Sequence, residues 1–479
     1  MTASANKHKE RRYIWMVLLA LFLFAFGLRW YYVSTAVVLD PVRGDATQYY
    51  AYALNLANHG TFSKDLPGSV VIHPDNYRDP GYPLFLALWM KLLGAGDAWY
   101  AGVLICQALL GALTVTLTTQ LGRHWLSLRW ATAAGVMMAL WPHSITINGY
   151  LLSETLFGFL VVLGMLATAS ALQRQSPWRA VVAGLTFGAA ALTNAILLPF
   201  GILLAAFLGW RKLASRRLCI ALAVGAVVLP GAWAVRNAAV VVPVAGSSST
   251  DRALLNFVQG SRPDFQSAWR KSVLGNEAEK AEAKTESLAV DQDYHLMRTS
   301  PMQAARSIVR RFSEHPLQYA RWYVVDKPAL FWGWSIEIGQ GDIFVFPTRN
   351  APFQVQPAWI ALVAICQALN TALMLLALAS LLIVWSRGQS LVSARRPMSH
   401  TVLVAVVSLA VFVTLVYSAL QAEPRYSIPF RPFEILMALT TLYGTAAWWH
   451  GRKRSAGVPD GDQHDDERTR PTSSQVAKT

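Results

Sequence analysis

Residues 13–33 read YIWMVLLALFLFAFGLRWYYV, an almost wholly apolar run with one charged residue, Arg29. A helix needs about 20 largely apolar residues to cross the hydrocarbon core of a bilayer. The run follows a basic N-terminus, as the apolar part of a signal peptide does. However, it has spanning length, ends in Arg29 and bulky aromatic residues, and lacks a small-residue cleavage site. The sequence therefore predicts a retained membrane-spanning helix here.

The 479-residue chain as a whole has the same character, with 54% apolar and 14% charged residues and a mean hydropathy of +0.33. A soluble domain holds about 25% charged residues, so a water-soluble globule is excluded. We predict an all-α polytopic membrane protein. One transmembrane module covers residues 1–450, and residues 451–479 form a polar, disordered cytoplasmic tail. The ten expected spans are 13–33, 98–121, 130–147, 151–171, 178–193, 195–210, 217–239, 357–385, 400–420 and 429–449.

The net charge of +15 is a topology signal. Basic clusters recur in alternate short loops, whereas the loops near Asn148 and Asn194 carry no charge. The positive-inside rule then puts both termini in the cytoplasm. No basic and aromatic stripe suggests nucleic acid, so the bilayer is the expected partner of these charges. Cys106, Cys219 and Cys366 each lie in an apolar run, which indicates neither a zinc site nor a disulfide framework.

Two long regions fall on the outer side, at residues 34–97 and 240–356. A structureless loop of that length is improbable, so both should contain helices. Residues 277–297 are rich in helix formers. Residues 316–336 mix Trp and Tyr with charged residues, which is typical of an interfacial helix.

The first outer region contains GDATQYYAYALNLANHG at 44–60. Asp45 precedes a helical stretch, and Tyr49 follows on the same helix face. As N-cap with Gln48 as its partner, Asp45 would form a capping box. A cap also fixes the carboxylate in one geometry, so the capping and functional interpretations are compatible.

Downstream, Arg78 and Asp79 stand before PGYP at 80–83, which predicts a rigid turn followed by a helix from about Leu84. A guanidinium held by a stiff turn at the membrane surface could bind a phosphate. The alternative is an arginine that snorkels at the headgroup level.

Glu154 is the only acidic residue between Asp97 and Asp251, and it begins the fourth expected span on the outer side. A functional carboxylate is one interpretation, because ionisable groups near the membrane are costly to bury. The other is support of the helix N-terminus, with Ser153 as the cap.

Arg236 ends the seventh span on the outer side, where the positive-inside rule makes an arginine unusual and an anionic partner plausible. Glu423, Arg425 and Tyr426 form the only charged short outer turn; an internal ion pair closing that turn is the alternative. All these charged groups gather on one side of the membrane. Such a site suits a reaction in which a lipid phosphate leaves and an acceptor is deprotonated.

These motifs occur in a fixed order. GDATQYYAYALNLANHG is followed by YRDPGYPLFLAL, LLSETLFGFL, LPGAWAVRN, EHPLQYARWYVVDKPALFW and EPRYSIPFRP. Over roughly residues 13–450 the chain resembles bacterial GT-C glycosyltransferases, and more closely the group of the lipid A aminoarabinose transferase, rhizobial galacturonosyl transferases and protein O-mannosyltransferases. The resemblance implies a polyprenyl-phosphate-linked sugar donor and an envelope acceptor. It also implies an active site on the extracytoplasmic face of a bacterial inner membrane.

The resemblance also assigns roles. Asp45 matches the catalytic base, Arg78 lies near the position of a basic residue for the donor phosphate, and Arg236 matches a second phosphate-binding arginine. Protein mannosyltransferases carry Asp-Glu where this chain has Gly44-Asp45, and the aminoarabinose transferase has a Lys before two prolines where this chain has Arg-Asp-Pro-Gly. No cofactor is required. Some relatives bind a metal nearby, for which His73 and Asp75 are the two ligand candidates. The other expected pocket residues are Tyr49, Tyr82, Glu154, Glu423, Arg425 and Tyr426.

Two other functions stay open. A transporter or flippase of lipid-linked sugars would need polar residues and broken helices at mid-membrane. Here the spans read as clean and the charges gather at one interface, which favours the enzyme. A polymerase or ligase of lipid-linked glycans is not separated from a sugar transferase by these motifs.

Overall fold

The computed structural model describes residues 2–94, 96–242, 244, 246–335, 346–387 and 397–456. Helices dominate this part of the chain. Its strands are β1 (Val37–Val38) and β2 (Thr348–Arg349), which pair antiparallel and join the two long loop regions. The chain is an all-α polytopic membrane protein, as its composition predicts.

Each of the ten expected spans contains a helix. Within the described residues, six helices are long and apolar enough to cross a membrane: α1 (Thr2–Thr35), α4 (Asp97–Gly122), α7 (Glu154–Arg174), α10 (Arg216–Val240), α18 (Pro357–Arg387) and α20 (Pro397–Ala419). The expected spans at 130–147, 178–193 and 195–210 are the shorter helices α5 (Leu128–Leu140), α8 (Pro177–Thr193) and α9 (Phe200–Trp210). The expected span at 429–449 is the long helix α21 (Arg431–Ala456).

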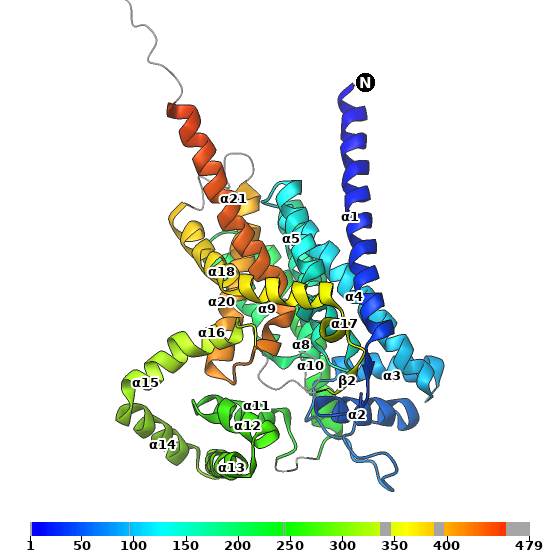
Figure 1. Cartoon of the computed structure of the whole chain (residues 1–479), viewed down its shortest axis with the longest axis vertical. Helices are drawn as coiled ribbons and strands as arrows, with labels where there is room; N and C mark the ends of the chain where they lie inside the picture. The colour runs from blue at the N-terminus through cyan, green and yellow to red at the C-terminus, as the bar shows by residue number, and fades with distance from the viewer. Residues whose placement is uncertain are drawn as a thin grey trace, which may run out of the picture.

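The N-terminus and the end of α21 lie at one end of the molecule, and the helices of residues 45–59 and 249–314 lie at the other (Figure 1). We call this second end the loop end. Both long loop regions contain helices, as predicted, and the expected helix at 277–297 is α13. The loop-region helices are α2 (Asp45–His59), α3 (Gly81–Leu93), α11 (Ser249–Gly260), α12 (Phe265–Leu274), α13 (Glu277–Thr299), α14 (Pro301–Glu314), α15 (Pro316–Arg321), the π-helix η3 (Trp322–Asp326), α16 (Lys327–Phe331) and α17 (Pro352–Val355).

The expected continuous spans at 130–147 and 151–171 are separated by a buried, broken segment. After α5, the chain forms α6 (Pro142–Thr146) and η1 (Ile147–Gly149), and residues 141–153 are all buried. Irregular backbone at this depth is tolerated only where protein groups satisfy it. Gln107 Nε2 donates to the carbonyls of Asn148 and Tyr150 at 2.9 and 3.0 Å. This segment carries the chain to Glu154, at the start of α7.

Close helix packing at the centre depends on glycine. A Cβ on Gly184 of α8 would lie 2.3 Å from the Leu222 carbonyl oxygen, and one on Gly225 of α10 would lie 2.4 Å from that of Val181. Small residues let membrane helices approach until their backbones touch. These two glycines therefore fix α8 against α10.

The spans are less clean than their sequence suggests. Arg431 and Glu434 at the start of α21 form an ion pair of 2.6 Å, and both side chains are buried. Arg29 in α1 is also fully buried. In addition, α21 continues to Ala456, past residue 451 where the tail is predicted to begin; residues 457–479, the rest of the predicted tail, lie outside the described residues.

Candidate active site

A cavity of about 520 Å³ lies at the loop end, where several helix termini meet. Its walls come from the starts of α2, α7 and α11, the end of α8 with η2 (Ala195–Leu197), the end of α20, and the 3-10 helix η4 (Pro424–Phe430). Each terminus contributes a charged or polar side chain. The charged residues on its wall are Asp45, Arg78, Asp79, Glu154, Arg252 and Arg425.

Asp45 is held between two arginines. Arg78 Nη2 donates to Oδ1 and Arg425 Nη2 donates to Oδ2, each at 2.7 Å. The expected capping box is wrong, because α2 begins at Asp45 itself, and Gly44 (φ 57°) stands at the N-cap without a side-chain cap. Gln48 Oε1 instead accepts from Arg78 Nε. In place of a cap bond to backbone N–H groups, the carboxylate accepts two charge-assisted bonds from guanidiniums, both of which line the cavity.

The same contacts set the protonation of Asp45. Burial alone would raise its pKa, but the charges and hydrogen bonds of Arg425 and Arg78 hold the pKa well below its usual range. The side chain keeps 29% of its surface exposed to the cavity, so burial is incomplete and the arginines dominate. Asp45 is therefore an anion at every working pH, and it is a weak base in this state.

Two tyrosines support the Arg78 side of the cavity. The Arg78 guanidinium lies over the Tyr49 ring at 5.2 Å, and Tyr49 meets Tyr82 edge-to-face at 5.1 Å. Tyr49 lines the cavity, as expected. Tyr82 does not: it is fully buried, and its hydroxyl donates to Gln107 at 2.9 Å. Tyr82 thus supports Tyr49 from behind.

The PGYP stretch is the first turn of α3, which begins at Gly81 rather than near Leu84. Proline is tolerated there because the first turn of a helix needs no N–H from it. The preceding Asp79 accepts from Arg252 Nη2 at 2.7 Å and from the Ala195 amide at 3.2 Å. The stretch therefore joins α11 to η2 as well as presenting Arg78.

The opposite wall pairs Glu154 with Arg425. Glu154 is the first residue of α7, Ser153 makes no cap bond, and Glu154 Oε1 lies 3.3 Å from Arg425 Nε. Burial alone would lower the pKa of Arg425, but Glu154 and Asp45 raise it well above its ordinary value. Arg425 therefore joins Asp45 of α2 to Glu154 of α7, and its guanidinium also lies 5.3 Å over the ring of Tyr426 in its own turn.

The rest of the η4 turn divides between the cavity and the core. Tyr426 lines the cavity and stacks on Tyr417 with ring centroids 5.2 Å apart. Glu423 is buried beside it and does not line the cavity. The turn thus supplies Arg425 and Tyr426 to the site.

Arg236 does not reach this cavity, contrary to its expected place beside Arg78. Its guanidinium donates to the carbonyls of Asp75 at 2.9 Å and Phe62 at 3.4 Å, and lies 4.8 Å over the Trp233 ring. The sequence predicted that it lies on the same side as Arg78 but could not show that the loop at 62–75 covers it.

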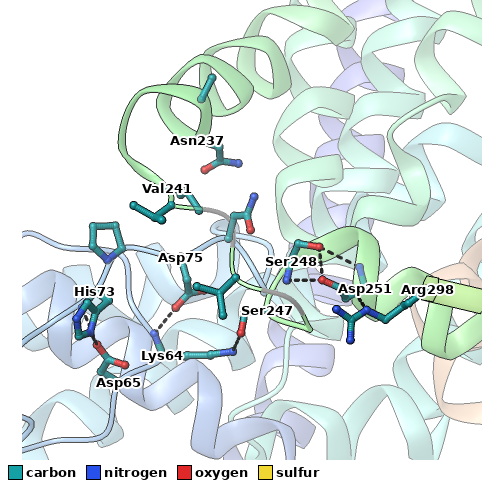
Figure 2. A pocket seen from close by; sticks show the side chains of 15 residues that line it. Lys64, Asp65, His73, Asp75, Asn237, Val241, Ser247, Ser248, Asp251 and Arg298 are labelled. Atoms are coloured by element: carbon teal, nitrogen blue, oxygen red, sulfur yellow. Dashed lines mark hydrogen bonds and ion pairs between the residues drawn. The ribbon is translucent and has the colours of Figure 1, made fainter. Parts of the chain in front are cut away.

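The two metal candidates line a second, larger cavity of about 1090 Å³ beside that loop (Figure 2). His73 Nδ1 pairs with Asp65 at 3.2 Å. Asp75 accepts from the Lys64 and Tyr77 amides at 2.7 and 2.9 Å, and from the Tyr52 hydroxyl. The two residues are therefore engaged separately, and the described residues contain no group of three or more His, Cys, Asp or Glu that could hold a metal.

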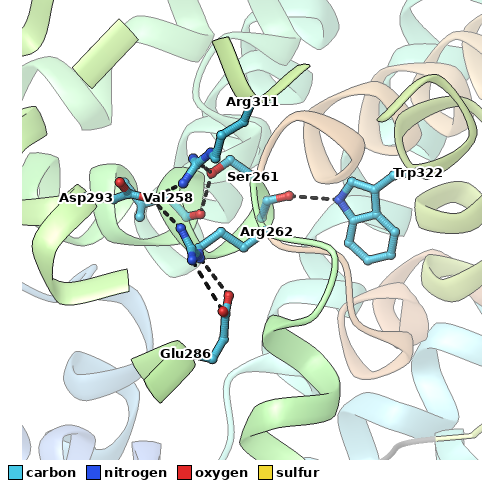
Figure 3. A network of polar contacts seen from close by, with 8 residues as sticks. Val258, Ser261, Arg262, Glu286, Asp293, Arg311 and Trp322 are labelled. Atoms are coloured by element: carbon cyan, nitrogen blue, oxygen red, sulfur yellow. Dashed lines mark hydrogen bonds and ion pairs between the residues drawn. The ribbon is translucent and has the colours of Figure 1, made fainter. Parts of the chain in front are cut away.

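Sequence analysis missed Arg252, which brings a third guanidinium to the first cavity. Its region contains many charges of both signs, so nothing marked it. The end of the same helix, α11, leads into an ion network in which Asp293 of α13 accepts from Arg262 at 2.8 Å and from Arg311, while Arg262 also pairs with Glu286 at 2.6 Å (Figure 3). This network fixes α11, and hence Arg252, against the other loop helices.

Comparisons with known proteins give a likeness of structure only. No family model matches the sequence, and no curated protein matches it. The archaeal oligosaccharyltransferase AglB from Archaeoglobus fulgidus, in complex with an inhibitory peptide and a dolichol-phosphate, is 15% identical with a TM-score of 0.48, over 94% of this chain and 53% of that one. The A. fulgidus enzyme with Zn and sulfate is 16% identical with a TM-score of 0.48, over 92% and 50%.

ArnT from Cupriavidus metallidurans, bound to undecaprenyl phosphate, is 14% identical with a TM-score of 0.35, over 95% of this chain and 83% of that one. This chain spans about half the length of the oligosaccharyltransferases. Because these scores lie below 0.5, the function proposed below rests on the chain's own site.

Proposed function

We propose that the chain is an integral-membrane glycosyltransferase that moves one sugar from a polyprenyl-phosphate-linked donor to an envelope acceptor such as lipid A, a glycan or a protein. The observation that carries this proposal is the convergence of Arg78, Arg252 and Arg425 around Asp45 in one cavity. Guanidinium groups bind phosphate oxygens through paired, charge-assisted hydrogen bonds. The wall carries three guanidiniums and three carboxylates, so a phosphate would bind by taking the place of a carboxylate on the guanidiniums. The position of the cavity at the ends of membrane helices suits a lipid.

The donor phosphate takes the place that the Asp45 carboxylate holds between Arg78 and Arg425. In the structure, that carboxylate is the anion that both guanidiniums bind at 2.7 Å. Phosphate oxygens compete for the same donors, so donor binding frees Asp45 from them. Burial then raises its pKa unopposed, and a weak base becomes a competent one once the donor is bound.

The transfer itself forms one bond and breaks one. The acceptor oxygen bonds to the anomeric carbon as the bond from that carbon to the phosphate oxygen breaks. A hydroxyl acceptor gives its proton to Asp45, and the polyprenyl phosphate leaves with the electron pair, stabilised by Arg78, Arg252 and Arg425. Glu154 keeps Arg425 directed into the cavity through their ion pair. This scheme requires no cofactor.

We assign the cavity to the extracytoplasmic side of a bacterial inner membrane and both termini to the cytoplasm. The alternation of basic and uncharged loops supports this assignment, as does the position of the N-terminus and the α21 end opposite the loop end (Figure 1). Reporter fusions at residues 60, 300 and 460 should read outside, outside and inside. A cytoplasmic reading at residue 300 would invert the site.

The function is tested by mass spectrometry of lipid A, glycans and envelope proteins from a deletion strain. One sugar should be missing from one acceptor class, and the wild-type chain should restore it. An Asp45→Asn chain, expressed at the same level in the membrane, should not. Normal sugar transfer by that variant would overturn the role of Asp45.

A flippase for the same lipid-linked sugar is the second candidate, because the structure removes one argument against it. The chain between α5 and α7 is broken into α6 and η1, and Asn148 of this segment lines a small buried cavity together with Glu154. Broken helices at a polar site are typical of transporters. Reconstituted vesicles separate the two: a transferase forms a new glycoside when given acceptor, whereas a flippase moves the intact labelled donor between leaflets. A polymerase or ligase would transfer a whole glycan in the same assay.

A further inference from the structure

The first membrane helix carries an arginine that the proposed chemistry does not use. Arg29 is fully buried, and its two Nη atoms donate to the carbonyls of Ala25 at 3.1 Å and of Ala139 and Met138 at 3.4 Å. It thereby caps the end of α5. Its Nε has no partner among the described residues, and the guanidinium has no ion pair there. A charge inside a membrane helix is costly, and usually marks a functional contact.

Arg29 lines a small cavity, and so do three residues with further buried polar atoms that have no partner in the described part of the chain. These atoms are Asn148 Oδ1, Glu154 Oε2 and Thr155 Oγ1. The cavity measures about 30 Å³ and lies behind Glu154, between α1, α4, α7 and the broken segment. A Cβ on Gly111 of α4 would lie 2.5 Å from Asn148 Oδ1 and 2.7 Å from Arg29 Nε. These two atoms therefore face the same point in the cavity wall.

The size and chemistry of the cavity identify its occupant. A buried water needs roughly 10–15 Å³ of such space and two to four polar partners. A buried polar group without a hydrogen bond costs free energy, so four of them around one space favour an ordered water strongly. A metal cation is disfavoured by the guanidinium, and an organic ligand does not fit.

We propose that this cavity holds ordered water that links Arg29 and Asn148 to Glu154. Arg29 donates through Nε to the water, and the water donates to the free Oε2 of Glu154. Glu154 Oε1 in turn pairs with Arg425, which binds Asp45. Arg29 is thus a positioning residue that acts on the site from inside the membrane. The water site stands on geometry alone, whereas its effect on turnover rests on the proposed function.

Arg29→Lys separates this role from the capping of α5. A lysine ammonium can still donate to the Met138 and Ala139 carbonyls, but it has no nitrogen at the Nε position. We expect the melting temperature to change little, and kcat to fall roughly tenfold, as for one lost hydrogen bond to a charged group. The KM for the polyprenyl-phosphate-linked donor should not change. The same loss should vanish in a Glu154→Gln background, because the water then no longer connects two charges. Additive losses would overturn the link.

A pair of glycine variants on one helix provides the matched control. Gly111→Ala inserts a methyl group against Arg29 and Asn148, whereas Gly122→Ala inserts one 2.6 Å from Leu436 Cδ2 in an apolar contact. Both should cost stability, but only Gly111→Ala should cost turnover per folded molecule. Equal turnover losses would overturn the positioning role.

The water itself is tested without any activity. A high-resolution map of the full chain should show density in the cavity within hydrogen-bond distance of Arg29 Nε and Glu154, and the Gly111→Ala map should lack it. An empty cavity in a well-resolved wild-type map would overturn the water site, whatever reaction the protein catalyses.

Discussion

Two carboxylates in this molecule are each held by two arginines, in regions far apart in the chain. Asp45 binds Arg78 and Arg425 at 2.7 Å, with side-chain exposures of 29%, 13% and 19%. Asp293 binds Arg262 and Arg311, with exposures of 16%, 18% and 22%. Each group also has a second acid, Glu154 or Glu286. Charge, geometry and burial are therefore nearly the same in the two.

The difference lies in what stands next to the charges. The 520 Å³ cavity is lined by Asp45 and both of its arginines and by no residue of the Asp293 group. Around Asp293 the neighbours are protein groups, such as Ser261, which accepts from Arg311 Nη2 at 3.3 Å (Figure 3). An ion cluster that lines no cavity connects helices, whereas the same cluster on a cavity wall can exchange its anion for a ligand. Access to the cavity, rather than the strength of the ion pairs, assigns the function.

The largest effect is expected at Asp45. Asp45→Asn removes the proton acceptor, so turnover should fall by roughly 100-fold or more. It also removes the anion that Arg78 and Arg425 share, so the melting temperature should fall as well. Polyprenyl phosphate should then raise the melting temperature of the variant more than that of the wild type, because it replaces that anion.

Kinetics and thermal melting with and without polyprenyl phosphate measure both effects. Asp40→Asn, at an exposed position in the same loop region, is the control and should change neither. Asp79→Asn is unsuitable as a control, because Asp79 holds Arg252. Near-normal turnover in folded Asp45→Asn would mean that the Asp45 cluster, like the Asp293 cluster, only connects helices, and would contradict its catalytic role.

The second effect concerns the arginines that face the cavity. Arg78→Lys or Arg425→Lys keeps the charge but loses the planar, two-pronged contact to phosphate. Donor binding should weaken by about 1.5–3 kcal/mol, the value of one hydrogen bond to a charged group. Titration with polyprenyl phosphate measures this change in binding free energy. Arg236→Lys is the matched control outside the cavity. An equal loss of binding free energy in Arg236→Lys would mean that Arg236 also binds the phosphate.

A stability effect without a catalytic one is expected from the other cluster. Asp293→Asn leaves Arg262 and Arg311 without their shared acceptor, which should lower the free energy of unfolding by about 1–3 kcal/mol. Turnover per folded molecule should stay close to the wild-type value, because none of these groups lines the cavity. Thermal melting and active-site-normalised kinetics measure the two. A selective loss of turnover would mean that the network carries function through Arg252.

Much of this molecule could be predicted from local sequence patterns. Apolar runs located a helix in all ten expected spans, and isolated charges located Asp45, Arg78, Glu154 and Arg425, because a charge beside a membrane is rare and costly. Helix continuity was less predictable. The break after α5 looks apolar, and the buried amide of Gln107 that satisfies its backbone lies far away in sequence.

The site predictions that the structure corrects depend on contacts between segments that are far apart in the sequence. The capping box at Asp45 obeys a correct local rule, but two arginines from distant segments bind the carboxylate instead. Arg252 stands among many charges and carries no local mark. Arg236 has the pattern of a ligand, yet a loop covers it. Sequence spacing reports which side of the membrane a charge occupies, while chain folding decides whether it meets a cavity.

The smallest expected effect is that of pH on the stability that Asp45 contributes, which should not change between about pH 8 and pH 5. A carboxyl whose folded pKa is lowered adds stability above its unfolded value and loses it only as pH falls through the folded value. Arg425 and Arg78 hold the pKa of Asp45 well below the usual value near 4. The difference in melting temperature between wild type and Asp45→Asn should therefore stay constant from about pH 8 to pH 5, and shrink only below about pH 4. With polyprenyl phosphate bound, the Asp45 carboxylate loses its two arginines and its pKa is no longer lowered, so this loss of the difference below about pH 4 should disappear. Melting curves across this range, with and without the lipid, measure both cases. A difference that fades between pH 7 and pH 5 without the lipid would mean that the two arginines do not hold Asp45 as an anion.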